Sequence, residues 1–321
     1  MPTMQAYSVK RTPRSEFIPI RHMHYHVLVW GDPHAKNELP PLVMMHGWMD
    51  VAASYQFMVD AFGEAFMANR LVIAADWRGF GLTKGAPTDN YWFPDYLADL
   101  DALLDHFSPD KPVDLLGHSM GGNVVMLYAG SRPERIHKLI NLEGFGSPDN
   151  APEQAPKRYA KWLDDIKSLH RGEKDLKAYN AVEGVARRLM KTNPRLARDE
   201  AGMAKAHWLA RHWAAEQMTG LDAGKWLILG DPAHKLISAY LYRAAETMAI
   251  YRNIEAPTMM VEASDDSLSQ WWDGKYTLAD FHERIKLVKN CSTHVIPDTS
   301  HMLHHDKPEE LARLIEGFLT A

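Results

Sequence analysis

VDLLGHSMGGNVVMLYA, residues 113–129, is the stretch that decides the fold of this chain. An apolar run, Val113 to Leu116, precedes Gly117 to Gly121, which spell Gly-His-Ser-Met-Gly. A helix-like stretch, Asn123 to Ala129, follows directly. A strand, a tight turn and a helix in this order hold a serine at an exposed corner. The sequence therefore predicts that Ser119 lies at the tip of a strand-to-helix turn.

The glycines around Ser119 suit such a turn for steric reasons. Gly117 and Gly121 lack the Cβ atom that would collide where a strand and a helix approach closely, and Gly122 extends the permissive stretch. A glycine-rich turn with a surface serine would show the same letters. The functional interpretation therefore depends on partners elsewhere in the chain.

A serine nucleophile needs a base to take its proton and a carboxylate to orient that base. The apolar run Thr293 to Ile296 leads to His301, and the run Thr258 to Val261 leads to acidic residues that include Asp266. Loops at the carboxyl ends of parallel strands converge on one crevice. We therefore expect His301 and one of these acids to face Ser119.

A second strand end predicts hydrogen-bond donors for a developing oxyanion. The apolar run Pro41 to Met45 ends in His46-Gly47-Trp48. The backbone N–H groups of Trp48 and Met120 would together form an oxyanion hole beside Ser119. A further apolar run, Leu71 to Ala75, leads into a glycine-containing loop, Asp76 to Gly81.

Taken in this order, these elements resemble the α/β-hydrolase superfamily over nearly the whole chain. His46 to Asp50, followed by Ala52-Ala53-Ser54, is most similar to the serine hydrolase-like proteins within it. The resemblance implies an α/β fold with a mostly parallel central sheet flanked by helices. It also implies Ser119 as nucleophile, His301 as general base and then general acid, and no cofactor.

The carboxylate that orients His301 has three candidates. The resemblance favours Asp266, three residues past Ala263, which closes the strand. Asp265 is its neighbour, and adjacent residues of an extended chain point to opposite sides, so only one of the two can face His301. Some relatives carry the acid after the sixth strand instead, where Ile136 to Leu142 ends in Glu143. We expect Asp266, with Glu143 and Asp265 as alternatives.

The composition changes in the middle of the chain. We expect a hydrolase core at residues 1–146 and 235–321, with a helical cap inserted at residues 147–234. The four tryptophans of this segment could line a substrate pocket, but a small cap has little core of its own, which favours packing roles. Apolar residues at helical spacing predict cap helices over residues 157–169, 175–190 and 200–218.

Arg21 to Trp30 shows strand periodicity, with His22, His24 and His26 on one face. Three histidines on one face could bind a metal, but no Cys, Asp or Glu interleaves with them, so we expect a solvated face and no metal site. His304 and His305 could likewise suggest a metal cluster, yet they lead into the final helix.

Charge and hydropathy exclude several classes of partner. The chain has 36 Lys and Arg against 41 Asp and Glu, a net charge of −5, without a basic block, so nucleic-acid binding is not expected. No apolar run approaches the roughly 20 residues that span a membrane. Cys291 is the single cysteine, and the N-terminus shows no secretion signal, which favours the cytoplasm. The expected partner is a small-molecule substrate, and the oligomeric state stays open.

The leading hypothesis is hydrolysis of an ester or lactone of small to medium, largely apolar substrates through an acyl-enzyme. Carbon–carbon bond hydrolysis and cofactor-free peroxidation could use the same triad. A ligand-binding receptor on a hydrolase scaffold is the alternative from another class.

Overall fold

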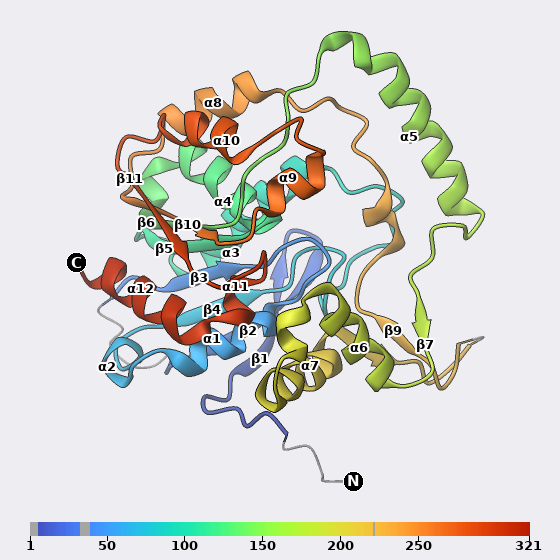
Figure 1. Ribbon diagram of the computed structural model, residues 1–321, viewed down its shortest axis with the longest axis horizontal. Coiled ribbons are helices and arrows are strands. Elements are labelled where there is room, and N and C mark those ends of the chain that lie inside the picture. Colours follow the sequence, from blue (N-terminus) through green and yellow to red (C-terminus); the bar gives the residue numbers. More distant parts are fainter. Residues whose placement is uncertain (1–5, 33–38, 221) are drawn as a thin grey trace.

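An eight-stranded sheet forms the centre of the computed structural model, which describes residues 6–32, 39–220 and 222–321 (Figure 1). The strand order is β1-β2-β4-β3-β5-β6-β10-β11. The first two strands are antiparallel to their neighbours, and the other six run parallel. The strands are β1 (Arg14–Ile20), β2 (Met23–Trp30), β3 (Leu42–Met45), β4 (Val72–Ala75), β5 (Val113–His118), β6 (Ile136–Leu142), β10 (Thr258–Ala263) and β11 (Cys291–Ile296).

The central strands are apolar because both faces of the sheet are covered. All residues of β3 and β4 are buried, as is typical of parallel strands between two helical layers. The strands predicted from the apolar runs are confirmed to within two residues at each end. β1 was not predicted, because it begins with the polar residues Arg14, Ser15 and Glu16 and contains Pro19, which disfavours a strand.

Helices cover both faces of the sheet and form two apolar cores. The helix that follows Ser119, α4 (Met120–Ser131), packs directly on β5 and β6. One face of the sheet is covered by α1 (Gln56–Ala61), α2 (Glu64–Met67), α11 (Leu303–Asp306) and α12 (Pro308–Thr320). The other face is covered by α3 (Phe93–Phe107), α4, α8 (Ala244–Arg252) and α10 (Leu278–Ile285). Helix α9 (Ser267–Trp272) lies at the carboxyl edge of the sheet.

The segment between β6 and α8 contributes no strand to the large sheet within its described residues. Its longest helix, α5 (Ala155–His170), stands apart from the sheet, and only Asp165 in it is buried (Figure 1). The segment also contains α6 (Val182–Thr192), α7 (Glu200–Trp213), β7 (Ala178–Tyr179), β8 (Ala214–Glu216) and β9 (Trp226–Ile228). The 3₁₀ turns in the described residues are η1 (Ala52–Tyr55), η2 (Pro133–Arg135), η3 (Pro152–Gln154), η4 (Pro194–Ala197) and η5 (Pro232–Lys235).

Two of the expected cap helices are shorter than predicted. The helix expected from residue 175 begins only at Val182, because Ala178 and Tyr179 pair with β9. The helix expected to reach residue 218 ends at Trp213, because β8 pairs with the same strand. The division into core and cap at residues 147 and 234 stays a prediction.

The expectation of a solvated histidine face on β2 is wrong for His26. This side chain is 5% exposed, and its Nδ1 lies 2.7 Å from Asp76 Oδ2. Its Nε2 lies 2.8 Å from Ser15 Oγ of β1, the strand that the sequence did not predict. His22 and His24 are exposed as expected. No described helix has the length and apolar character needed to cross a membrane.

A buried ion pair fixes the loop that follows β4. Arg78 Nε and Nη2 bond both oxygens of Asp99 on α3, at 2.5 and 2.7 Å. The Tyr25 hydroxyl donates to the same carboxylate at 2.5 Å. Asp99 is fully buried, so its charge is balanced by protein groups. This loop also carries Trp77, whose N–H donates to His46 Nε2 at 2.9 Å.

We expect Asp99→Asn to lower the free energy of unfolding by about 3 kcal/mol, because Arg78 would keep a buried, poorly compensated charge. Urea unfolding followed by tryptophan fluorescence measures this. The matched control is Asp89→Asn, which removes an exposed pair with His170 and should cost about 0.5 kcal/mol or less. Equal losses in both variants would contradict the argument.

Candidate active site

Ser119 lies between β5 and α4 in a strained backbone conformation. Its φ is 53° and its ψ is −115°, values that residues other than glycine rarely adopt. The Ser119 N–H donates to the Leu142 carbonyl at 2.8 Å, and its carbonyl accepts from the Asn123 N–H at 3.0 Å. The side chain is half-buried. Hydrogen bonds on both sides thus hold the residue at the carboxyl edge of the sheet.

Glycines make this turn sterically possible. A Cβ on Gly117 would lie 2.3 Å from the Gly121 carbonyl oxygen, and one on Gly121 would lie 2.2 Å from the Met45 carbonyl oxygen. On Gly122 it would lie 2.4 Å from Asn141 Oδ1. These distances are shorter than any contact that a carbon atom tolerates, so the close approach requires glycine.

His301 is paired with Glu143. His301 Nδ1 lies 3.1 Å from Glu143 Oε2, and the carboxylate is 1% exposed. Two other donors reach this carboxylate, since the Ala263 N–H donates to Oε1 at 2.7 Å and the Ser267 hydroxyl to Oε2 at 2.9 Å. A buried carboxylate with three donors is well suited to orient a histidine ring and to stabilise its charged form.

Asp266, the expected partner of His301, is used elsewhere. Its Oδ1 accepts from the Ser269 N–H at 2.9 Å and its Oδ2 from the Ser269 hydroxyl at 2.5 Å, so Asp266 is the N-cap of α9. Asp265 forms an ion pair with Arg195 at 2.6 Å. Of the three candidate carboxylates, Glu143, one of the alternatives, contacts His301 in this structure, whereas Asp266 and Asp265 bond other groups.

The local backbone explains this difference. Helix α9 begins directly after Asp266, which turns that side chain toward the helix N-terminus. Glu143 follows β6, the strand beside β5, and adopts a φ of 57°. Its N–H donates to the Val261 carbonyl at 3.1 Å, which anchors it between β6 and β10. The only sign of Glu143 as a partner of His301 in the sequence was its position directly after an apolar strand.

Two residues that the sequence analysis did not assign to the site hold His301 in place. His118 Nε2 donates to the His301 carbonyl at 2.8 Å. Burial holds the pKa of His118 well below its usual value, so this ring is neutral. The Trp271 ring meets the His301 ring edge-on, with centroids 4.3 Å apart. His118 therefore links Ser119, its neighbour in the chain, to the His301 loop.

The loop after β3 approaches Ser119 closely. A Cβ on Gly47 would lie 3.1 Å from Ser119 Cβ. His46 Nε2 accepts from Trp77, so its proton is on Nδ1 and is donated to the Gly47 carbonyl at 2.7 Å. Burial lowers the pKa of His46 and favours this neutral form. The Trp48 indole is 52% exposed, and its Nε1 donates to the His234 carbonyl at 3.3 Å.

The segment between β6 and α8 contacts both loops of the candidate site. Trp213 Nε1 donates to the Met49 carbonyl at 2.8 Å, next to Trp48. On the other side, Arg195 of η4 pairs with Asp265 and Asp298, at 2.6 and 3.3 Å. These carboxylates belong to the loops after β10 and β11. The contacts of Trp213 agree with the packing role that was favoured for the tryptophans.

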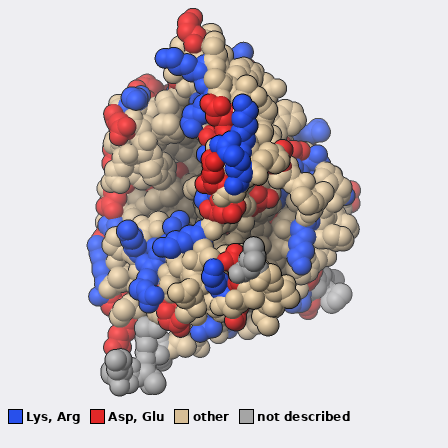
Figure 2. Space-filling model, turned by 90° about the vertical axis from the view of Figure 1, so that its right-hand side faces the viewer, with Lys and Arg blue, Asp and Glu red and all other residues tan. Residues whose placement is uncertain are grey.

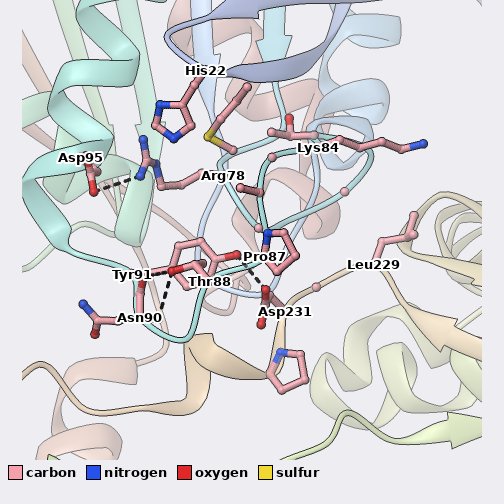
Figure 3. A pocket seen from close by; sticks show the side chains of 18 of the residues that line it. His22, Arg78, Lys84, Pro87, Thr88, Asn90, Tyr91, Asp95, Leu229 and Asp231 are labelled. Atoms are coloured by element: carbon pink, nitrogen blue, oxygen red, sulfur yellow. Dashed lines mark hydrogen bonds and ion pairs between the residues drawn. The ribbon is translucent and has the colours of Figure 1, made fainter. Parts of the chain in front are cut away.

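A cavity of about 920 Å³ lies away from these residues, between the loop after β4 and the segment around β9 (Figure 3). Its lining includes Arg78, which pairs with Asp95, and Tyr91, whose hydroxyl donates to Asp231 at 2.9 Å. Neither Ser119 nor His301 lines it. The face on which α5 stands is hollowed on both sides of a row of charged side chains (Figure 2). We place the candidate site at Ser119 because the Ser119 N–H bonds Leu142, the neighbour of Glu143, and His118, the neighbour of Ser119, bonds the His301 carbonyl.

The sequence profile of the alpha/beta hydrolase fold matches residues 40–308. The chain belongs to the α/β-hydrolase fold family. A serine hydrolase-like protein of Dictyostelium discoideum is 24% identical over 293 residues, covering 90% of this chain and 77% of the relative. A pimeloyl-[acyl-carrier protein] methyl ester esterase of Aeromonas hydrophila is 29% identical over 192 residues, covering 59% of this chain and 68% of that protein.

Among solved structures, a thioesterase domain from the curacin biosynthetic pathway is similar to this α/β-hydrolase in fold. The TM-score is 0.76 at 20% identity, and the match covers 95% of this chain and 99% of the other. The family and the serine hydrolase-like relatives support a hydrolase.

We expect Arg195→Ala to speed amide hydrogen exchange over residues 298–302 about fivefold. A fivefold faster exchange means that the free energy of local opening falls by about 1 kcal/mol, which is the contribution expected of partly exposed ion pairs. The control is Arg198→Ala, since Arg198 contacts Asp298 but is 54% exposed. Exchange measured by mass spectrometry should change less in the control. Unchanged exchange in Arg195→Ala would contradict a role in holding this loop.

Proposed function

We propose that this α/β-hydrolase cleaves carboxylic esters or lactones through a Ser119–His301–Glu143 triad. The observation that carries the proposal is the hydrogen bond of His301 to the buried Glu143 carboxylate at 3.1 Å, in a loop that His118 joins to a serine in a strained strand-to-helix turn. A base oriented by a carboxylate, next to a serine held in this way, is the arrangement that activates a hydroxyl for nucleophilic attack.

In the proposed reaction, Ser119 Oγ attacks the substrate carbonyl carbon while His301 Nε2 takes the hydroxyl proton. The Glu143 carboxylate accepts a hydrogen bond from His301 Nδ1 and stabilises the imidazolium. The tetrahedral intermediate then expels the leaving alcohol, which receives the proton from His301. Water attacks the acyl-enzyme by the same steps, and the acid product and free Ser119 result.

The proposed oxyanion hole consists of the N–H groups of Trp48 and Met120. Met120 begins α4, so its N–H is one of the four at a helix start without an intrahelical acceptor. The hydrogen bond from Trp213 to the Met49 carbonyl holds the loop that carries Trp48, and Gly47 leaves no room for a Cβ between this loop and Ser119. Donors held in place before the reaction stabilise the negative charge at low reorganisation cost.

We propose a small to medium, largely apolar substrate. Trp48 lies in the loop after β3 that carries the proposed oxyanion donor, and Trp271 packs against His301. Their side chains are 52% and 49% exposed. On α5, Tyr159 and Leu163 are also exposed. Large exposed apolar side chains often mark binding surfaces. We propose that residues 147–234 act as a cap whose apolar side chains select the substrate. The similar Aeromonas protein is named as a methyl ester esterase, which supports an ester as the substrate class.

Turnover of p-nitrophenyl esters from acetyl to decanoyl tests the proposal. We expect multiple turnovers in the wild type and a loss of at least about 10⁴-fold in kcat for Ser119→Ala, because the nucleophile is removed. Ser131→Ala, an exposed serine on α4, is the matched control and should keep full activity. Equal rates in Ser119→Ala and wild type would overturn the proposal.

No ester turnover by the wild type would also contradict the ester assignment. Activity on a carbon–carbon substrate would then favour that class of hydrolase. Stoichiometric ligand binding without turnover would favour a receptor.

The identity of the triad acid has its own test. We expect Glu143→Gln to lower kcat about 10⁴-fold with little change in KM, because the amide cannot support the charged His301. Asp266→Asn should stay within about twofold of wild type, since Asn is as good an N-cap as Asp. A large loss in Asp266→Asn together with an active Glu143→Gln would return the assignment to Asp266.

A further inference from the structure

A second group of polar side chains is buried behind the candidate triad. Asp50 lies in the loop after β3, two residues past Trp48, and His304 and His305 lie on α11. Asp50 is 6% exposed, His304 0% and His305 3%. One ligand atom from each lies within 4.8 Å of the others. Neither the proposed mechanism nor the packing of the sheet uses this group.

Polar atoms without a partner are concentrated here. Eleven buried side-chain nitrogen or oxygen atoms of the described residues lack a hydrogen-bond partner. Four of them are Asp50 Oδ2, both ring nitrogens of His304, and Nδ1 of His118, whose ring lies 4.5 Å from that of His304. Buried polar groups are normally satisfied, so this concentration indicates a polar or ionic occupant.

The spacing of the unpartnered atoms is wider than a hydrogen bond. His304 Nε2 lies 3.8 Å from Asp50 Oδ2, whereas N–H···O bonds measure about 2.7–3.2 Å. Two ligands of one tetrahedral zinc ion, each at about 2.0–2.2 Å from the metal, are roughly 3.4 Å apart. The observed distance is therefore close to that between ligands of a shared ion.

We propose that Asp50, His304 and His305 bind one divalent transition-metal ion of the zinc type. Two imidazoles and one carboxylate are a donor set that suits zinc or cobalt, whereas magnesium and calcium prefer oxygen ligands. The Ser54 hydroxyl donates to Asp50 Oδ1 at 2.7 Å and orients the carboxylate, which leaves Oδ2 for the metal.

His305 Nε2 lies 2.7 Å from Ser54 Oγ. Ser54 donates its single proton to Asp50, so without a metal ion His305 Nε2 donates to Ser54 Oγ. To ligate, Nε2 would exchange Ser54 for the ion, and the ring proton would move to Nδ1. A cavity of about 230 Å³ between η4, α7 and the loop after β11 borders the group, since His305 is part of its lining. Its charged lining residues are Asp199, Asp298, Asp306, Arg195, Arg198, Lys205 and Lys307.

Such an ion would cross-link the loop after β3 to α11 and thereby stabilise the folded chain. This inference does not rest on the hydrolase proposal, because it concerns other residues and its test reads metal content and melting temperature. Failure of either proposal therefore leaves the other standing.

The test uses the full chain without a histidine tag, treated with chelator and dialysed against Co²⁺. We expect one bound cobalt per chain, a visible absorption band of four-coordinate cobalt, and a melting temperature that rises with Co²⁺ concentration. His304→Gln and Asp50→Asn should each weaken cobalt binding at least about tenfold. The exposed His106→Gln is the matched control and should bind as the wild type does.

Absence of bound cobalt in the folded wild type at tenfold molar excess would overturn the proposal without reference to any variant. Equal binding in wild type and the two ligand variants would also overturn it, because the metal would then lie elsewhere. Circular dichroism of each variant without metal checks that it folds, and His305→Gln replaces any variant that does not.

Discussion

The close approach of β3, β5 and α4 around Ser119 is the constraint on which the candidate site depends. Ser119 is kept at a φ of 53° by backbone hydrogen bonds to Leu142 and Asn123. Such strain persists only where the surrounding structure determines the conformation. Gly117 and Gly121 make that possible, because a Cβ on either would overlap backbone carbonyl oxygens. The same approach brings the oxyanion loop beside the serine.

The position of Glu143, the proposed triad acid, and the start of α9 depend on each other. Glu143 collects donors from Ala263 and Ser267, which belong to β10 and α9, as well as from His301. With Glu143 in that place, Asp266 is free to cap α9. A chain that used Asp266 to orient His301 would lose the side-chain N-cap of that helix. Each carboxylate thus accepts a hydrogen bond from one backbone N–H and one serine hydroxyl.

The segment between β6 and α8 contacts loops that lie far apart in the sequence. Trp213 holds the loop after β3 through the Met49 carbonyl, while Arg195 holds the loops after β10 and β11 through Asp265 and Asp298. The proposed oxyanion donors and the proposed base are therefore both braced by the same segment. Any displacement of this segment must change the contacts of both loops at once.

Local spacing in the sequence was sufficient for seven of the eight strands of the large sheet, for the strand-turn-helix around Ser119, and for the family. Apolar runs and glycine positions depend on the nearest neighbours in the chain, and these contacts are the ones that short stretches encode. Which of Asp266, Asp265 and Glu143 contacts His301 depended on the donors that each carboxylate gains from other segments. Burial of His26 against β1 depended likewise on a strand that the sequence did not reveal. Contacts between distant segments are made only when the chain is folded, and for that reason the tertiary structure alone decided them.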